Sequence, residues 1–205
     1  MTPGALNAEQ HRERAMPSRD DAVALLEEWV ENEGLRKHMY AVEAAVRNYA
    51  RKMGADEETW GLAGLLHDLD WEKNPDVHPL ESVKALKDRG YPEEVVHAVL
   101  AHRPEYTGVE PETDLDRVLY ACDEISGLIH AACLMRPNGI DDIKPKSVVK
   151  KLKDKAFAAG VDRDQVTRGI ELIGLERNEH IQNVIDGMRE VGEVLGIRGE
   201  DLRKD

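Results

Sequence analysis

Two adjacent residues of metal-binding type, His67 and Asp68, end the apolar run Leu65-Leu66-His67-Asp68. Four further residues of the same type stand on either side of this pair, namely His38, His78, His102 and Asp123. Successive candidates are separated by 29, 10, 24 and 21 residues, counted from Asp68 to His78 across the pair. Imidazole nitrogens and carboxylate oxygens without thiolates are the ligands of hydrolytic divalent metals. The pattern therefore predicts a metal centre.

The number of candidate ligands bears on the number of metals. Six protein ligands are too many for one hydrolytic metal that keeps open positions, whereas they suit two metals about 3.5–4 Å apart. A carboxylate has two oxygens, so Asp68 is expected to bridge the two ions. We expect two divalent cations per chain, drawn from Fe, Mn, Zn, Ni, Co and Mg, with a shared hydroxide as the nucleophile.

Carboxylates near the metal pair are candidates for proton transfer. Asp70 and Glu72 follow the pair closely, so we group them with Asp68 as candidate catalytic residues, each able to act as a general acid or base. The alternative for Asp70 and Glu72 is that both are simply solvated.

Four basic residues are candidates for binding substrate phosphate. Lys73 and Arg103 stand next to predicted ligands, where Arg would bind in a bidentate manner and Lys as a point charge. Lys146 and Lys150 belong to a basic island in an acidic chain and lie four residues apart, on one face of a predicted helix. They are expected to reach over the mouth of the pocket, unless they belong to a solvated helix face.

The remaining histidines are expected to be structural, because a lone histidine is more often structural than ligating. This group consists of His11, His97, His130 and His180.

The order H…HD…H…H…D resembles the HD-domain superfamily of metal-dependent phosphohydrolases. The resemblance covers about residues 30–136 and rests on three motifs: Arg36-Lys37-His38, Leu65-Leu66-His67-Asp68 and Tyr120-Ala121-Cys122-Asp123. His78 and His102 match the extra histidines of the two-metal branch, which includes bacterial diadenosine tetraphosphatases and HD-GYP cyclic-dinucleotide phosphodiesterases. The layout is most similar to the tetraphosphatase-like group and to HDIG-type hydrolases.

This resemblance implies an enzyme that hydrolyses a phosphate ester or anhydride of a small molecule by a metal-activated hydroxide. The implied substrate is a nucleotide or dinucleotide. Two alternatives stay open. The same superfamily contains di-iron oxygenases with the same ligand order, and a non-catalytic metal-binding helical domain would also retain the ligands.

Composition limits the partners that we expect. The formal net charge of −13 disfavours a nucleic-acid polymer, because the phosphate backbone would be repelled. No apolar run reaches the roughly 18–20 residues that span a bilayer, so no membrane partner is expected. The two cysteines, Cys122 and Cys133, lie too far apart on one predicted helix for a disulfide, which suits a reduced cytoplasmic protein. The chain is expected to be a monomer or homodimer.

The elements that must position these residues are predicted to be helices, because no segment alternates with period two. We expect an all-α HD-type bundle of about eight to nine helices. Helix starts are predicted after Ser18, Asp56 and Thr113, and a break at Gly34. Later helices are expected at 147–158, 162–173 and 175–195. The expected organisation is a disordered tail (1–17), a single domain (18–198, with its metal-site core at about 30–136 and C-terminal helices at 147–196) and a frayed end (199–205).

Overall fold

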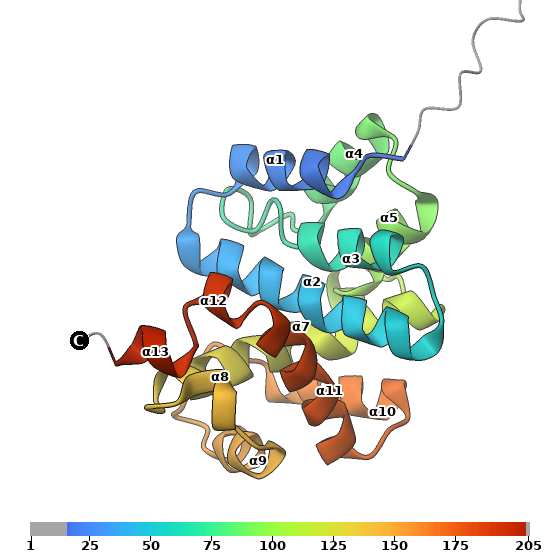
Figure 1. The fold of residues 1–205 in the computed structure, drawn as a ribbon. Helices are drawn as coiled ribbons and strands as arrows, with labels where there is room; N and C mark the ends of the chain where they lie inside the picture. The colour runs from blue at the N-terminus through green and yellow to red at the C-terminus, as the bar shows by residue number, and fades with distance from the viewer. Residues whose placement is uncertain (1–15, 204–205) are drawn as a thin grey trace, which may run out of the picture.

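The computed structural model describes residues 16–203, and this part of the chain is helical without strands (Figure 1). The all-α prediction is confirmed. The nine longer helices are α1 (Arg19–Trp29), α2 (Glu33–Met53), α3 (Glu57–Leu66), α4 (Leu80–Arg89), α5 (Glu93–Ala101), α7 (Asp114–Leu134), α9 (Pro145–Lys153), α10 (Arg163–Ile173) and α11 (Arg177–Glu190). Four short helices complete the described chain, namely α6 (Pro104–Thr107), α8 (Gly139–Asp142), α12 (Gly192–Leu195) and α13 (Gly199–Leu202).

The predicted helix starts rest on side-chain caps. The side chains of Ser18, Asp56 and Thr113 accept hydrogen bonds from backbone N–H groups in the first turns of α1, α3 and α7. The predicted break at Gly34 was wrong, because Gly34 lies within the first turn of α2. The chain breaks instead just before α2, where the side chain of Asn32 accepts from the backbone N–H of Leu35 at 2.9 Å.

Helix α2 forms the centre of the bundle, and α3, α7 and α11 pack against it (Figure 1). The approach of α3 to α2 is close, since a Cβ on Gly64 would come within 2.8 Å of the Cα of Glu43. Only glycine permits this distance, and His67 follows one turn later. The close contact therefore fixes the end of α3, and with it the His-Asp pair, against α2.

Helix α7 is the second central element, and α10, α2, α5 and α11 pack along it. Apolar residues of α11 pack into the core; the buried ones are Ile181, Val184, Ile185 and Met188. Figure 1 shows α10 and α11 beside α7 on the side of α2 away from α3. This packing brings the C-terminal helices close to residues on α7.

The structure differs from the expected C-terminal boundaries in three places. Pro145 begins α9, and the helix ends at Lys153 because the backbone of Asp154 is extended. The expected helix at 175–195 divides into α11 and α12. The expected frayed end contains α13, which is tied down by hydrogen bonds from the backbone N–H of Gly199 and the Arg198 guanidinium to Asp141. Residues 1–15 and 204–205 of the two expected tails lie outside the described residues.

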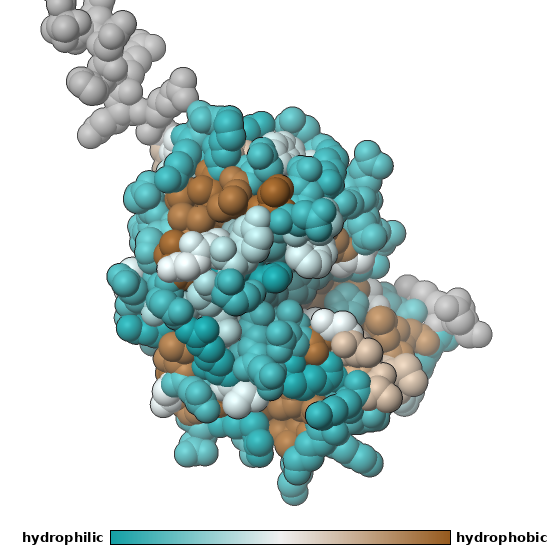
Figure 2. Space-filling view, turned by 180° about the vertical axis from the view of Figure 1, so that it is seen from behind, coloured by the Kyte–Doolittle hydropathy of each residue, from teal (hydrophilic) through white to brown (hydrophobic). Residues whose placement is uncertain are grey.

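The face shown in Figure 2 is largely hydrophilic, and its hydrophobic residues gather in separate patches. Among residues 16–203, no helix combines the length and the apolar character needed to cross a membrane. Both cysteines are free and buried.

Candidate metal centre

The six candidate ligands come from five helices or their ends. His38 lies in α2, His67 and Asp68 follow the last residue of α3, and the others stand just before α4, directly after α5 and within α7 (His78, His102 and Asp123). The structure brings all six together in two groups, His38 with His67 and Asp123, and Asp68 with His78 and His102. Within each group the potential ligand atoms lie within 4.8 Å of one another.

Asp68 lies between the two groups. Its Oδ2 is 3.4 Å from Nε2 of His67 and 3.7 Å from Nε2 of His38. Its Oδ1 is 3.2 Å from Nε2 of His78 and 3.7 Å from Nε2 of His102. One oxygen therefore faces each group, which is the geometry that a bridging carboxylate needs.

Three of the histidines are oriented by hydrogen bonds on the far side of the ring. Nδ1 of His67 donates to the carbonyl of Gly64 at 2.9 Å, and Nδ1 of His102 donates to the carbonyl of Val99 at 2.5 Å. Nδ1 of His78 donates to Oδ1 of Asp70 at 2.7 Å. These bonds place the proton on Nδ1 and leave each Nε2 lone pair directed at the cluster, as in metal-binding histidines.

The donor set fits divalent cations. Nε2 of His67 is buried and has no hydrogen-bond partner among the described residues. Nε2 of His78 and Nε2 of His102 lie 3.0 Å apart. Two facing lone pairs repel unless a positive charge lies at them, and a buried acceptor without a partner is costly. A cation in each group relieves both features.

Electrostatics in the cluster also favour positive charge. Burial alone would lower the pKa of His67, yet Asp68 and Asp123 raise that pKa well above its ordinary value. Burial would likewise raise the pKa of Asp123, but His38 and His67 hold it well below its usual range. Burial would raise the pKa of Asp68 too, but His67 and His102 hold it below its usual range. Both carboxylates are therefore ionised and attract a proton or a metal to the nitrogens around them.

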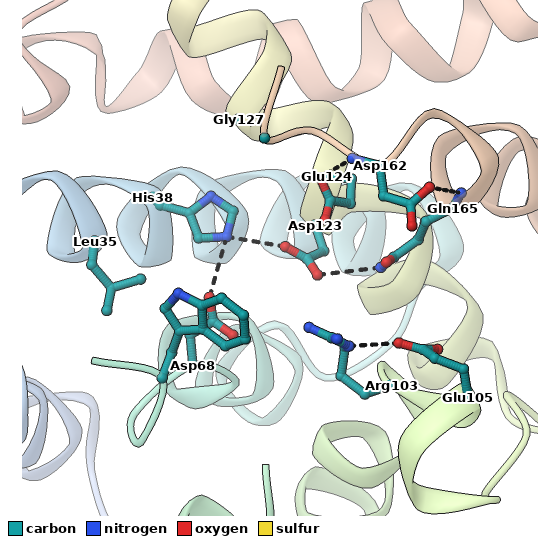
Figure 3. A pocket seen from close by; sticks show the side chains of 12 residues that line it. Leu35, His38, Asp68, Arg103, Glu105, Asp123, Glu124, Gly127, Asp162 and Gln165 are labelled. Carbon is teal, nitrogen blue, oxygen red and sulfur yellow. Dashed lines mark hydrogen bonds and ion pairs between the residues drawn. The ribbon is translucent and has the colours of Figure 1, made fainter. Parts of the chain in front are cut away.

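An open cavity of about 430 Å³ lies over the cluster (Figure 3). It is lined by Leu35, His38, Asp68, Trp71, Arg103, Glu105, Asp123, Glu124, Gly127, Gly160, Asp162 and Gln165. Figure 3 shows Leu35 at one end, Asp162 and Gln165 at the other, and the ligands His38, Asp68 and Asp123 between them. A molecule in this cavity would reach both groups of ligands.

The two further candidate carboxylates differ in position. Asp70 is fully buried and, besides bonding His78, accepts from the backbone N–H groups of Glu81 and Ser82 at 2.9 and 3.0 Å. It orients His78 and does not line the cavity. Glu72 does not line the cavity, and its exposed carboxylate accepts from the backbone N–H groups of Glu31 and Asn32, just before α2.

Of the four basic candidates, the structure places only Arg103 in the cavity wall. Lys73 is exposed, with its Nζ 3.5 Å from the carbonyl of Glu28. Lys150 lines a different cavity, beside Arg136 and Ser147, and Lys146 is exposed on the same helix. The structure therefore does not bring Lys146 or Lys150 into the wall of the cavity over the metal ligands.

Sequence reasoning missed the wall that α10 and the preceding loop supply. Nε2 of Gln165 lies 3.4 Å from Oδ2 of Asp123, and the backbone N–H of Asp162 donates to Glu124 at 2.9 Å. The Arg163 guanidinium shapes the loop by donating to the carbonyls of Ala158 and Val161. These residues lie far from the ligand motifs in sequence, so no spacing indicated them.

Glu124 and Trp71 also line the cavity, each next to a residue that the motifs indicated. Burial and the adjacent Asp123 raise the pKa of Glu124 to about 7. Trp71 follows Asp70 directly, and its position near the His-Asp pair was the available signal.

Comparison with known proteins agrees with this geometry. The family model described as HD domain matches residues 35–128. Ribonuclease Y of Oleidesulfovibrio alaskensis is 27% identical over 135 residues, covering 64% of this chain and 24% of the relative. Ribonuclease Y of Cutibacterium acnes is 34% identical over 93 residues, covering 42% of this chain and 17% of the relative. The chain thus spans a quarter or less of the length of these relatives. No solved structure matches the chain.

Proposed function

Since residues 35–128 form a domain of the HD family, we propose that the protein is a metal-dependent phosphohydrolase acting on a small phosphorylated molecule of the nucleotide class. One observation carries this proposal: Asp68 lies between two groups of ligands at the floor of an open cavity. The reaction transfers a phosphoryl group of an ester or anhydride to water and releases an alcohol or a second phosphate.

Each residue of the cluster has a role in this proposal. One group of ligands would hold one divalent cation, the second group would hold another, and Asp68 would bridge them. Bound divalent cations supply an activated hydroxide and stabilise the charge of the phosphoryl oxygens. Arg103 would bind the substrate phosphoryl group, because its guanidinium lines the same cavity. Asp70 and Gln165 keep His78 and Asp123 in position.

A second candidate function is cleavage of an RNA phosphodiester, because the relatives named above are ribonucleases. The net charge of −13 weighs against a long polyanion. Among residues 16–203, Arg103 is also the only Lys or Arg that lines the cavity. We therefore favour a small substrate over a polymer.

Metal content and phosphate release test the proposal together. Elemental mass spectrometry on protein purified without chelator should find close to two metals per chain. Phosphate release is then assayed with a panel of nucleotides and a short RNA, in air and under anaerobic conditions. Release of phosphate without oxygen supports the hydrolase, and RNA cleavage alone supports the second candidate. If the protein contains iron, consumes oxygen and hydrolyses none of the substrates, the proposal is refuted in favour of an oxygenase. If it binds metal but turns over no substrate, it is a non-catalytic metal-binding domain.

A further inference from the structure

Trp71 is an unusual feature of the cavity wall. It is 41% exposed, whereas Trp60 is packed in the core at 7%. A large exposed aromatic side chain inside a concave site is a surface on which a ligand can bury apolar area. Within the described part of the chain, the other large apolar side chain of this wall is Leu35.

Contacts hold Trp71 beside the metal ligands. Its backbone N–H donates to the carbonyl of Asp68 at 3.1 Å. Its ring meets the ring of His78 edge-on, with centroids 5.1 Å apart and an interplanar angle of 81°. The guanidinium carbon of Arg103 lies 5.6 Å from the centroid of the Trp71 ring. An aromatic surface and a phosphate-binding cation are therefore neighbours in one wall.

The charges of the wall limit how many phosphates can enter. Glu105, Glu124 and Asp162 line the cavity in addition to the two aspartate ligands, and Arg103 already donates to Glu105 at 2.7 Å. Figure 3 shows Glu124 and Asp162 together at the end away from Leu35. These carboxylates would repel additional phosphate groups of a ligand, because both are negatively charged. Hydroxyl or amine groups of a ligand would instead donate hydrogen bonds to the carboxylates.

The size of the cavity also favours a ligand with a single phosphate group. A volume of about 430 Å³ lies near the lower limit of pockets that hold small ligands. One base, one sugar and one phosphate suit this space better than a dinucleotide does.

We propose that the cavity takes a compound with one phosphoryl group joined to a planar ring, such as a nucleoside monophosphate, and that Trp71 determines this specificity by stacking on the ring. The placement of the phosphoryl group at Arg103 and the metal ligands rests on the proposed function. Hydroxyl or amine groups of the same molecule face Glu124 and Asp162.

Equilibrium binding tests this proposal without turnover. Calorimetry on the Mn²⁺-loaded protein compares the phosphonate analogues of adenosine 5′-monophosphate and ribose 5-phosphate, in which CH₂ replaces the ester oxygen. Base stacking on an aromatic side chain is worth about 1–3 kcal/mol, or roughly 5- to 150-fold in affinity. We expect the adenosine analogue to bind tighter by a factor in this range, and Trp71→Ala to abolish the difference. Trp71→Phe should retain most of it.

Two controls separate stacking from structural damage. Trp71→Ala should leave the metal content unchanged, which shows that His78 is still in place. Any loss of affinity for the ribose analogue, through the contact between Trp71 and Arg103, should be much smaller than the loss for the adenosine analogue. Tyr106→Ala removes another exposed aromatic side chain, at 48%, that does not line the cavity, and it should change neither affinity.

Three outcomes would overturn the inference: equal affinity for the two analogues in the wild type, an unchanged preference in Trp71→Ala, or tighter binding of the methylene analogue of adenosine diphosphate. Phosphate release from adenosine monophosphate is measured separately. Tighter binding of the adenosine analogue without phosphate release would reject the proposed hydrolase but support stacking on Trp71. Phosphate release with equal binding of the two analogues would support the hydrolase but reject stacking on Trp71.

Discussion

Nε2 of His78 and Nε2 of His102 lie 3.0 Å apart in the interior, where the two residues are only 2% and 0% exposed. The opposite nitrogens are held by Asp70 and by the carbonyl of Val99. Both lone pairs therefore face the same point, together with Oδ1 of Asp68. Positive charge at that point relieves the repulsion between the lone pairs, so bound metal is expected to stabilise the folded state.

Removal of metal should lower the stability of the protein. A ligand that binds only the folded state at a thousandfold excess over its dissociation constant stabilises by about 4 kcal/mol. We expect the midpoint of thermal unfolding to fall by several degrees in chelator and to recover when Mn²⁺ is restored. The His78→Ala/His102→Ala double variant serves as the control, since its response to metal should be much smaller. An unchanged midpoint of thermal unfolding of the wild-type protein in chelator would contradict this expectation.

Asp68→Ala should abolish metal binding and activity, because the two oxygens of Asp68 face the two groups of ligands. Its helical content should stay mostly intact, since Asp68 lies just after α3 rather than within it. Metal content by mass spectrometry and circular dichroism check the two parts. The matched control is Asp76→Ala, the same change at an exposed position of the same loop. Turnover at the wild-type rate in Asp68→Ala would refute the assignment of the site.

Asp70→Asn should weaken metal affinity by about 10- to 100-fold, the usual effect of removing a carboxylate that orients a ligating histidine. Glu72→Gln should not change metal affinity or turnover, because Glu72 lies outside the cavity and bonds the backbone before α2. It should instead lower the stability slightly, because its hydrogen bonds to the backbone N–H groups of Glu31 and Asn32 weaken. Metal titrations and chemical unfolding of both variants distinguish the two roles. Equal loss of turnover in both would restore Glu72 as a candidate acid or base.

Local sequence signals predicted much of this arrangement. The caps of α3 and α7 and the spacing of His38, the His-Asp pair and Asp123 are properties of neighbouring residues, so they can be read along the chain. The positions of Lys146 and Lys150 could not be read in this way. Their side of α9 is decided by the packing of that helix on α7 and α11, which involves contacts distant in sequence.

The same reason explains why Gln165 and Asp162 were missed. Their approach to Asp123 and Glu124 depends on the packing of α10 against α7, and on a loop that Arg163 shapes through backbone carbonyls. Glu72 was grouped with the candidate catalytic residues for a different reason. Its short distance from the His-Asp pair in sequence does not bring it to the ligands, because the loop turns its side chain toward the start of α2.

Arg103→Ala should raise the Michaelis constant for a phosphorylated substrate by about tenfold or more, since a charge-assisted hydrogen bond contributes roughly 1.5–3 kcal/mol. Lys146→Ala and Lys150→Ala should leave it unchanged, because neither residue lines the cavity over the metal ligands. Steady-state kinetics of the three variants against one substrate check this contrast. A raised constant in Lys146→Ala would return that lysine to the substrate site.

His180 should make the protein sensitive to acid. Nε2 of this buried histidine donates to the carbonyl of Ala121, and Nδ1 accepts from the Tyr49 hydroxyl at 2.7 Å. Burial lowers the pKa of His180 to about 4. In the unfolded chain a histidine titrates near a pKa of about 6.5. Between these two values the unfolded state binds more protons, so stability falls as the pH drops from 6.5 toward 4.

The loss from this residue amounts to about 3 kcal/mol over that interval. His180→Gln keeps a donor and an acceptor but does not titrate, so its stability should fall less steeply with acid. Urea unfolding of both proteins at several values of pH, in chelator so that metal release does not contribute, measures the difference in slope. Parallel slopes would mean that His180 is already protonated in the folded state and that its bond to Tyr49 is not the one described.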